Sequence, residues 1–561
     1  MQRRLAAKHH AFRLCNLTVP KNGAEVITMS SLIDITKIEA EVDEAFENNE
    51  LVNLPFAQGI WTLLSVVEDH HFKITTYSPL GDNEASIYAD VLLNTLTHPL
   101  RVCYQRAVKG SYQFQRSLIE NHYILANSWL SAAKDYNHFC SIFPLYHAGK
   151  VNLRIHEKEL IPTDWLATDM SYEVYDRFIA KRDPEKELAV DRSLIRNEVK
   201  LATRVVEGNY SLVFTRRLME KLKSTLGVAL AGRHSLPENW KFSSFSLHQY
   251  RKIFTCLQVM AYAWFTARQL AAAEGAPACA FASALWTPKK GSLVTKIVKN
   301  TGIEQFAVTE VLRYLTFGEA GIRNPDIAIQ PIVDLTNGQY AISPFVILHV
   351  NSERNLCVLL NQIPLERKLY SRLVDQKEQE VRSETIASLS GLGLDFRNGK
   401  LADTDIDLAI IDRKSKICLC IEIKWFIEPA EIREVLARSD ELAKGVAQAK
   451  KIALAFSRCD ARLMYLLDVD PSYDFLSMVA SVNFIGRQQI QDSEVPITKL
   501  WHLTSEIRKQ GKLSEVLKWL RSRSYLPREG EDYKIREFGI RSGEWNSRWY
   551  GIEHTKPVNR I

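Results

Sequence analysis

This chain of 561 residues lacks several features that would place it quickly. Its nine cysteines form no Cys-x-x-Cys pair, which argues against structural zinc and fits a reducing compartment, so we expect a cytoplasmic protein. No apolar run approaches the roughly 18 residues of a membrane-spanning helix. Residues 1–22 have no apolar core like that of a signal peptide. We therefore expect no membrane contact.

Familiar catalytic motifs are missing as well. The chain has neither a Gly-x-Ser-x-Gly elbow nor a His-Glu-x-x-His zinc site. Residues 393–400 come close to a phosphate-binding loop, but they have one residue too many between the glycines, and Leu401 stands where Ser or Thr is required. The sequence therefore predicts no ATPase motor.

Charge alone does not identify a partner. The chain has 72 Lys and Arg against 66 Asp and Glu, a formal net charge of +6, so a nucleic-acid surface would have to be a local basic patch. One candidate is the predicted helix that carries Arg216, Arg217, Lys221 and Lys223. This face is either solvated or follows a phosphate backbone.

The most informative segment is 403–424, whose pattern predicts a β-hairpin. Two apolar runs, 408–411 and 417–421, flank the polar turn Arg413-Lys414-Ser415-Lys416. Strand side chains alternate between faces, so the register decides which residues share a face. The midpoint of the turn, between its second and third residues, fixes that register.

In this register Asp407 lies opposite Glu422, and Asp405 lies opposite Lys424, with all four side chains on one face. Opposed Cβ atoms are about 5 Å apart, where two carboxylates repel and do not both stay ionised without a cation. A hard divalent ion such as Mg²⁺ meets that need, because it takes carboxylate oxygens as ligands. The lysine can then hold a water or a phosphate oxygen.

A turn followed by a solvated acidic strand end is the alternative. The flanks argue against it, because one face of the hairpin is aliphatic and the other carries small or apolar residues before it turns acidic. These faces are formed by Leu408, Ile410, Leu419, Ile421 and Ile423, and by Ala409, Ile411, Cys418 and Cys420. Charges at the end of such a buried strand must be paired or bound to metal.

The order Asp, gap, Glu-x-Lys formed by Asp407, Glu422 and Lys424 resembles the catalytic signature of the PD-(D/E)XK nuclease superfamily. The residue before the aspartate is Ile406 rather than proline. The resemblance covers about residues 366–505 and implies a restriction-endonuclease-like α/β domain with an αβββαβ core. The matching pattern consists of a helix over 369–389, a short strand after the turn at 391–396, the hairpin, a helix over 429–452, and strands over 462–468 and 478–484.

The resemblance also implies a site and an activity. Mg²⁺, which Mn²⁺ can replace, would be held by Asp407, Glu422, the backbone carbonyl of Ile423 and Glu380 of the first helix, with Glu384 as the alternative, while Lys424 orients a water. Gln448 and Lys450 lie where members carry a Gln or Lys, or are surface residues. The implied activity is Mg-dependent hydrolysis of phosphodiester bonds, DNA being the expected substrate, in defence or nucleic-acid maintenance. RNA as the substrate, and exonuclease rather than endonuclease action, stay open. The alternative is a non-catalytic nucleic-acid-binding or scaffold protein.

A second resemblance lies upstream. Two predicted helices, 292–300 and 304–316, are joined at Thr301-Gly302-Ile303, and strands over 327–335 and 339–346 follow around Asn337-Gly338. The order resembles a winged helix-turn-helix. The second helix has Arg313 and two glutamates, a poor match for a DNA groove, so packing or dimerisation is the alternative to DNA contact.

The C-terminal region mixes basic and aromatic residues. A helix is predicted over 506–523, and arginines beyond it alternate with Trp545, Trp549 and Tyr550. Such a tail can clamp a backbone and stack bases, or the tryptophans can dock it onto the nuclease-like domain.

We therefore expect a multidomain protein with a mainly α-helical N-terminal half, a winged-helix-like middle segment and an α/β C-terminal domain. The helical half would choose the substrate, or bind a protein partner or a second copy of the chain. We expect translation to start at either Met1 or Met29. The expected segments are a tail (1–28), two helical domains (29–163 and 164–290), the winged-helix-like segment (291–365), the nuclease-like domain (366–505) and a basic, aromatic extension (506–561).

Overall fold

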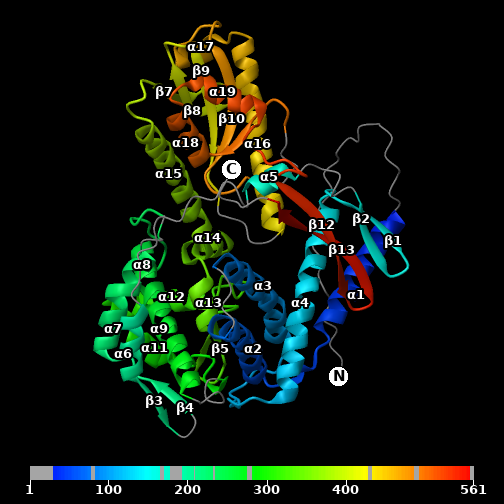
Figure 1. The fold of residues 1–561 in the computed structure, drawn as a ribbon, viewed down its shortest axis with the longest axis vertical. Helices are drawn as coiled ribbons and strands as arrows, with labels where there is room; N and C mark the ends of the chain where they lie inside the picture. Colours follow the sequence, from blue (N-terminus) through cyan, green and yellow to red (C-terminus); the bar gives the residue numbers. More distant parts are fainter. Residues whose placement is uncertain are drawn as a thin grey trace.

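The computed structural model describes residues 29–77, 82–163, 170–176, 192–206, 209–231, 234, 236–274, 281–426, 432–485 and 492–555. Helices dominate the chain up to residue 388, and the largest sheet follows in the C-terminal half (Figure 1). The expected division into a mainly helical first half and an α/β second half is confirmed at this level. None of the described helices is long and apolar enough to cross a membrane.

The lower lobe in Figure 1 is built around two buried helices, α2 (Phe56–Thr76) and α9 (Leu247–Ala273). α9 begins at a capping box, in which Ser246 and Gln249 satisfy each other's backbone N–H groups. Further described helices of this half are α1 (Met29–Glu47), α3 (Asp82–Arg106), α4 (Glu120–His147), α5 (Ser171–Val174), α6 (Arg192–Ala202), α7 (Arg216–Leu222), α8 (Val228–Ala231), α13 (Pro344–His349) and α14 (Ser352–Gln362). They are accompanied by α11 (Lys290–Thr301) and α12 (Gln305–Leu315), by a 3-10 turn at Glu50–Asn53, by a π-helical turn at Lys223–Gly227 and by a hairpin of β3 (Thr203–Val206) and β4 (Asn209–Leu212).

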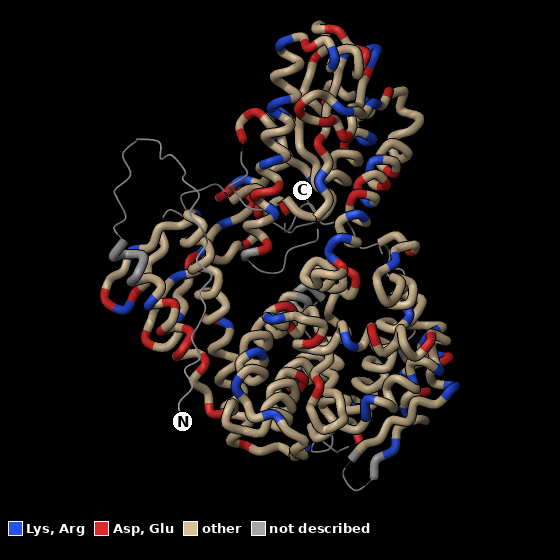
Figure 2. The backbone as a smooth tube through the Cα atoms, turned by 180° about the vertical axis from the view of Figure 1, so that it is seen from behind, with Lys and Arg blue, Asp and Glu red and all other residues tan. Residues whose placement is uncertain are grey.

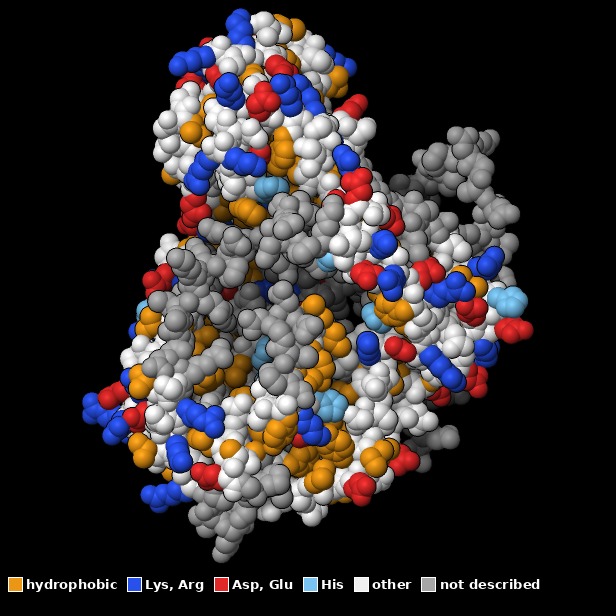
Figure 3. Space-filling model, in the orientation of Figure 1, with side chains coloured by type: hydrophobic (Ala, Val, Ile, Leu, Met, Phe, Trp, Pro, Cys, Tyr) orange, Lys and Arg blue, Asp and Glu red, His pale blue; other side chains and the backbone are white. Residues whose placement is uncertain are grey.

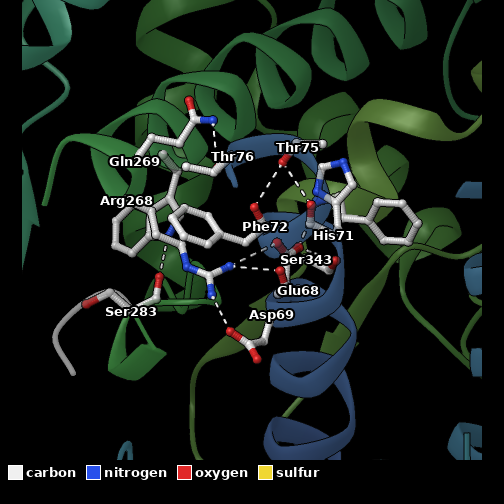
Figure 4. A network of polar contacts seen from close by, with 12 residues as sticks. Glu68, Asp69, His71, Phe72, Thr75, Thr76, Arg268, Gln269, Ser283 and Ser343 are labelled. Atoms are coloured by element: carbon white, nitrogen blue, oxygen red, sulfur yellow. Dashed lines mark hydrogen bonds and ion pairs between the residues drawn. The ribbon is translucent and has the colours of Figure 1, made fainter. Parts of the chain in front are cut away.

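A buried ion network joins α2 to α9 (Figure 4). Arg268 is 1% exposed and donates to the backbone carbonyl of Glu68 at 3.0 Å, and its guanidinium lies 4.3 Å from the ring centroid of Phe72. The Glu68 carboxylate accepts hydrogen bonds from the Ser343 hydroxyl at 2.5 Å and from the Phe345 N–H at 2.7 Å. The guanidinium of Arg268 and the carboxylate of Glu68 lie 3.8 Å apart, and breaking a buried ion pair of this kind costs about 3–5 kcal/mol, so this network ties the lobe together.

The segment predicted to resemble a winged helix contains α11 (Lys290–Thr301) and α12 (Gln305–Leu315), joined at Gly302 in a left-handed conformation with φ +71°. Its strands are much shorter than expected: β5 covers Ile332–Asp334 and β6 covers Tyr340–Ile342. Residues 327–331 form turns instead of strand, because the Asp326 carbonyl accepts from Ile329 and Gln330. Arg313 is paired with Glu310 at 2.8 Å.

The upper lobe in Figure 1 contains a five-stranded mixed sheet in the order β11-β10-β9-β8-β7. β7, β8 and β9 are antiparallel neighbours, whereas β9, β10 and β11 are parallel. Helices α16, α18 and α19 contact β9 or β10, and α15 contacts β9. The elements are α15 (Pro364–Ser388), β7 (Asp395–Lys400), β8 (Asp405–Asp412), β9 (Ile417–Lys424), α16 (Ile432–Ser457), α17 (Ala461–Leu467), β10 (Asp474–Ser481), β11 (Ile497–Lys499), α18 (Leu500–Gln510) and α19 (Leu513–Ser522).

Two predicted elements of this lobe are wrong. The strand expected over 462–468 is helix α17, because the Asp460 side chain caps the N–H groups of Arg462 and Leu463. The helix expected over 506–523 is two helices, since Gly511 takes a left-handed conformation with φ +63° between α18 and α19. The strand expected over 478–484 begins earlier, as β10, and the expected helix start at Pro429 lies outside the described residues.

The C-terminal chain returns to the N-terminal half. β12 (Tyr533–Ser542) and β13 (Trp545–His554) form a hairpin that joins β1 (Asn152–His156) and β2 (Glu159–Thr163) in a sheet of order β1-β2-β13-β12. Trp545 donates to Glu41 at 2.9 Å, and Trp549 stacks on His138 with ring centroids 5.2 Å apart. The two tryptophans are 7% and 8% exposed. They therefore dock the tail on the helical half, not on the upper lobe, and their rings are not exposed for stacking with bases.

Candidate active site

The hairpin β8–β9 has the predicted register. Leu408 pairs with Ile421 and Asp412 pairs with Ile417, so the turn midpoint lies where the sequence predicts it. The two faces also separate as expected, since Ala409, Ile411, Cys418 and Cys420 form a small core with α17 that is distinct from the main core. The face that bears Asp407 and Glu422 is the continuation of this small-residue face.

The backbone ladder between β8 and β9 ends just before Asp407. Beyond this point the N–H of Ile423 in β9 donates to the Oδ2 atom of Asp407 at 2.8 Å. A side chain therefore takes the place of a backbone acceptor. This bond fixes the orientation of the Asp407 carboxylate at the point where the strands diverge.

Glu422 is the most buried member of the site, at 3% exposure. Its Oε1 atom lies 2.7 Å from the Nζ atom of Lys424, and its Oε2 atom is buried without a hydrogen-bond partner among the described residues. Lys424 also donates to Gln448 Oε1 at 3.3 Å. One carboxylate oxygen is therefore compensated and the other is left for a further ligand.

The charges of the site are out of balance. Burial, followed by repulsion from Asp407, raises the pKa of Glu422 to about 7 against the pull of Lys424. Burial also raises the pKa of Asp407, although its bond from Ile423 opposes this. Burial lowers the pKa of Lys424, but the surrounding carboxylates raise it above its ordinary value overall. A single lysine does not neutralise this group, so the site favours an added proton or cation.

Glu378 of α15 belongs to this group and was missed in the sequence. Burial raises the pKa of Glu378, Lys424 lowers it, and Asp407 raises it further, so these three charges act on one another. The sequence did contain a signal for Glu378. Position 378 lies four residues after Val374 and three before Val381, so it shares a helix face with two residues that pack against the main core. Arg382, one turn later, also acts on Asp407 and lowers the pKa of that carboxyl.

The two glutamates predicted for this role lie elsewhere on α15. Glu380 and Glu384 both pair with Lys377, at 3.8 Å and 3.9 Å, and their side chains are 42% and 70% exposed. Asp405 is exposed on β8, and its charge raises the pKa values of Asp407 and Glu422.

α16 approaches the site closely at Gly445. A Cβ atom at this position would lie 3.2 Å from Cε of Lys424 and 3.5 Å from Cγ of Glu422, so a side chain here would press on the pair. Gln448, three residues later, contacts Lys424 as expected for the same helix face. Lys450 instead forms an ion pair with Asp492 at 2.6 Å, away from the hairpin.

The donor atoms of these side chains are of the type that a hard cation prefers. Asp407, Glu422 and the nearby Glu378 supply only oxygen donors, the ligands that Mg²⁺ and Mn²⁺ prefer, and Glu422 Oε2 has no hydrogen bond to give up. Within the described parts of the chain, however, no group of three or more His, Cys, Asp or Glu side chains is already gathered around one metal position. The carboxylates would have to move together to bind an ion.

Comparisons with protein-family models, with curated proteins and with solved structures each found no match.

Proposed function

We propose that this protein is a metal-dependent nuclease that hydrolyses phosphodiester bonds of nucleic acid, with DNA as the expected substrate and Mg²⁺ or Mn²⁺ as the cofactor. The observation that carries the proposal is the buried Glu422 carboxylate, which has one oxygen on Lys424, the other without a hydrogen bond, and Asp407 beside it. A group with a raised pKa beside a specific charge partner is typical of functional sites. The order α15-β7-β8-β9-α16-α17-β10 supports the proposal, because it contains the αβββαβ order that the PD-(D/E)XK resemblance implies, with the short helix α17 inserted before β10.

Each residue of the site has its own role in the proposed reaction. Asp407 and Glu422 would bind the metal, together with the Ile423 carbonyl, and Glu378 would take the part first expected of Glu380. When bound, the metal supplies Lewis acidity, lowering the pKa of a water and stabilising charge on the phosphate. Lys424 holds its ammonium beside Glu422, where it can orient that water or contact a phosphate oxygen. Gln448 positions Lys424.

The test is a cleavage assay on plasmid, linear, single-stranded and branched DNA and on RNA, with Mg²⁺, Mn²⁺ or EDTA. We expect Asp407→Ala, Glu422→Gln and Lys424→Ala each to lower cleavage by at least about a hundredfold, and the double variant Asp407→Ala/Glu422→Gln to be little worse, because such residues act as a unit. Full cleavage by Glu422→Gln, or in excess EDTA, would contradict the proposal.

Glu378 and Glu380 offer a matched comparison on one helix. Glu378→Gln removes a charge that acts on Asp407 and Lys424, whereas Glu380→Gln removes one that pairs with Lys377. We expect the first variant to raise the Mg²⁺ concentration needed for half-maximal cleavage and the second to leave it unchanged. The reverse result would restore Glu380 as the metal ligand.

The second candidate is a non-catalytic nucleic-acid-binding or scaffold protein. It is favoured by the contacts of Lys424, whose ammonium is held by both Glu422 and Gln448. Basic and acidic residues are mixed over both lobes in Figure 2, and apolar side chains gather on the lower lobe in Figure 3, where a protein partner or a second copy could bind. Calorimetric titration with Mn²⁺ separates the candidates, since a scaffold has no need to bind the ion at Asp407. Defence and nucleic-acid maintenance both stay open as cellular roles.

A further inference from the structure

The helical half contains a cavity of about 670 Å³. Its walls come from the π-helical turn Lys223–Gly227, from α8, from α9 and from the C-terminal end of α11. Small-molecule sites typically have volumes of roughly 300–1,000 Å³. None of the residues proposed for nucleic-acid hydrolysis lines this cavity.

One face of α9 forms the longest wall. The lining residues His248, Arg251, Lys252, Thr255 and Val259 recur every three or four positions, which places them on one side of a helix. From the first to the last of them the helix advances about 16 Å. Basic residues therefore occupy the end near the N-terminus of α9, and an apolar residue lies deeper along the same wall.

The basic end of the cavity carries excess positive charge. Arg251 donates to Glu353 at 2.6 Å, and Lys223 donates to the carbonyl of Asn300, so these two are held in place. Lys252 is exposed and forms no hydrogen bond or ion pair with any residue that the structure describes.

Acidic groups around this end are few and engaged. Glu238 is the one acidic residue among the described residues of the lining, and it pairs with His248 at 2.6 Å. Glu353 lies behind Arg251. The ammonium of Lys252 is thus the basic group of this end that no described residue holds in a hydrogen bond or ion pair. The hydrogen bond with His248 lowers the pKa of the Glu238 carboxyl, and the charge of Lys252 also acts on this group and lowers its pKa further.

Another part of the lining is apolar. Val228 and Ala231 of α8 face the cavity together with Val259 and Cys256 of α9. Burial raises the pKa of the Cys256 thiol to about 12, so this residue contributes a neutral surface. The π-helical turn between α7 and α8 adds a residue to the helix and brings Gly227 to the lining, and such turns occur frequently at functional sites.

We propose that this cavity binds a small organic anion. The phosphate or carboxylate of this anion lies beside Lys252 near the start of α9, and the apolar body of the anion lies against Val228 and Val259. The site is separate from Asp407 and Glu422, and the inference does not depend on the proposed nuclease activity.

The experiment is isothermal titration calorimetry of the full-length protein in EDTA with four probes. AMP and octanoate join an anion to an aromatic and an alkyl body, whereas adenosine and inorganic phosphate supply each half of AMP alone. We expect AMP or octanoate to bind with a Kd below about 1 mM. If AMP is the compound that binds, adenosine and phosphate should each bind at least about tenfold more weakly than AMP. If octanoate is the compound that binds, neither adenosine nor phosphate should bind.

Variants locate the binding. Thr255→Trp fills the cavity and should abolish binding, and Lys252→Glu should weaken it about tenfold, since it reverses the charge of this ammonium. Lys150→Glu, a charge reversal on an exposed lysine outside the lining, and Asp407→Ala should leave the Kd unchanged. If Thr255→Trp does not fold, Ala231→Trp takes its place, because Ala231 is exposed at the cavity wall.

Three outcomes would overturn the proposal. They are no binding of either AMP or octanoate, binding that survives the cavity-filling variants, and binding that Asp407→Ala removes. The last outcome would move the ligand to the hairpin. Adenosine that binds as tightly as AMP would also contradict it, because the anion would then contribute nothing.

Discussion

At the scale of single residues, the carboxylate of Glu422 shows the least compensated environment of the proposed site. One oxygen lies 2.7 Å from Lys424, and the other is buried with no hydrogen bond from a described residue. A buried polar atom left in this state costs about 1–3 kcal/mol, more if it carries charge. Protonation or metal binding removes that cost, and the two differ in their dependence on pH.

The first prediction follows from the raised pKa of Glu422. Between its ordinary value of 4.5 and its folded value of about 7, the folded state binds more protons than the unfolded state. The stability from this group is present below the ordinary pKa and is lost as the pH rises through the folded pKa. In EDTA we expect the melting temperature of the wild type to fall from pH 5 to pH 8 by more than that of Glu422→Gln.

Added Mn²⁺ should reverse this trend, because it binds the ionised carboxylates and stabilises the wild type more at pH 8 than at pH 5. Glu68 has a pKa raised to about 7 by burial and contributes a similar slope to both proteins, so the difference between the two proteins is the quantity to measure. Glu380→Gln serves as the control. Equal pH slopes for wild type and Glu422→Gln would contradict the charge assignment.

At the scale of secondary-structure elements, the site depends on how closely α16 approaches β9. Gly445 allows this approach, since a Cβ atom there would lie 3.2 Å from Lys424. Glycine inside a helix is unfavourable by roughly 0.5–1 kcal/mol relative to alanine, so its position here is explained by the neighbouring side chains. The helix loses intrinsic stability in exchange for a close contact with the Lys424–Glu422 pair.

The second prediction separates these two effects. Gly445→Ala should lower cleavage at least about tenfold by displacing Lys424, while the free energy of unfolding changes by less than about 1 kcal/mol. Gly291→Ala in α11 is the matched control, because a Cβ atom there meets nothing within 4 Å. Chemical denaturation and the cleavage assay measure both quantities. Full activity of Gly445→Ala would show that the position of Lys424 tolerates the methyl group.

The sequence predicted the hairpin well because local rules determine it: alternating side chains and a short turn leave one register that buries the apolar residues. It failed at α17, where a short apolar run fits either a strand or a helix and only the Asp460 cap decides between them. It named Glu380, with Glu384 as the alternative, and did not consider Glu378, because family resemblance fixes a helix but not its rotation. The approach of Gly445 and the destination of the C-terminal hairpin depend on contacts between distant segments, which no local pattern encodes.

At the scale of the whole molecule, the two lobes are tied by segments that cross between them. Tyr175, beside α5, accepts a hydrogen bond from the Lys499 N–H at 3.2 Å and bonds to His502 at 2.9 Å. Asp176 forms an ion pair with Lys499 at 2.5 Å. The upper lobe therefore includes residues from the first half of the chain, and a fragment that starts at Pro364 would leave Lys499 without this partner.

The third prediction concerns the C-terminal hairpin. Trp549 is 8% exposed and stacks on His138, so Trp549→Ala should destabilise the protein by about 3–5 kcal/mol and make the hairpin sensitive to proteases. Nucleic-acid affinity of the folded variant should be unchanged. A variant that keeps its stability but loses affinity would instead support base stacking by this ring. Urea denaturation and a filter-binding assay distinguish the two results.

The pairing of β13 with β2 has a consequence for biosynthesis. The Ser547 hydroxyl donates to the Leu160 carbonyl across 387 residues of sequence, so the edge of β2 stays without β13 until these intervening residues and β13 have been made. At translation rates of about 5–20 residues per second this interval lasts roughly 20–80 s. A ribosome-bound intermediate therefore presents an open strand edge to chaperones, and a product that terminates before β13 cannot close it.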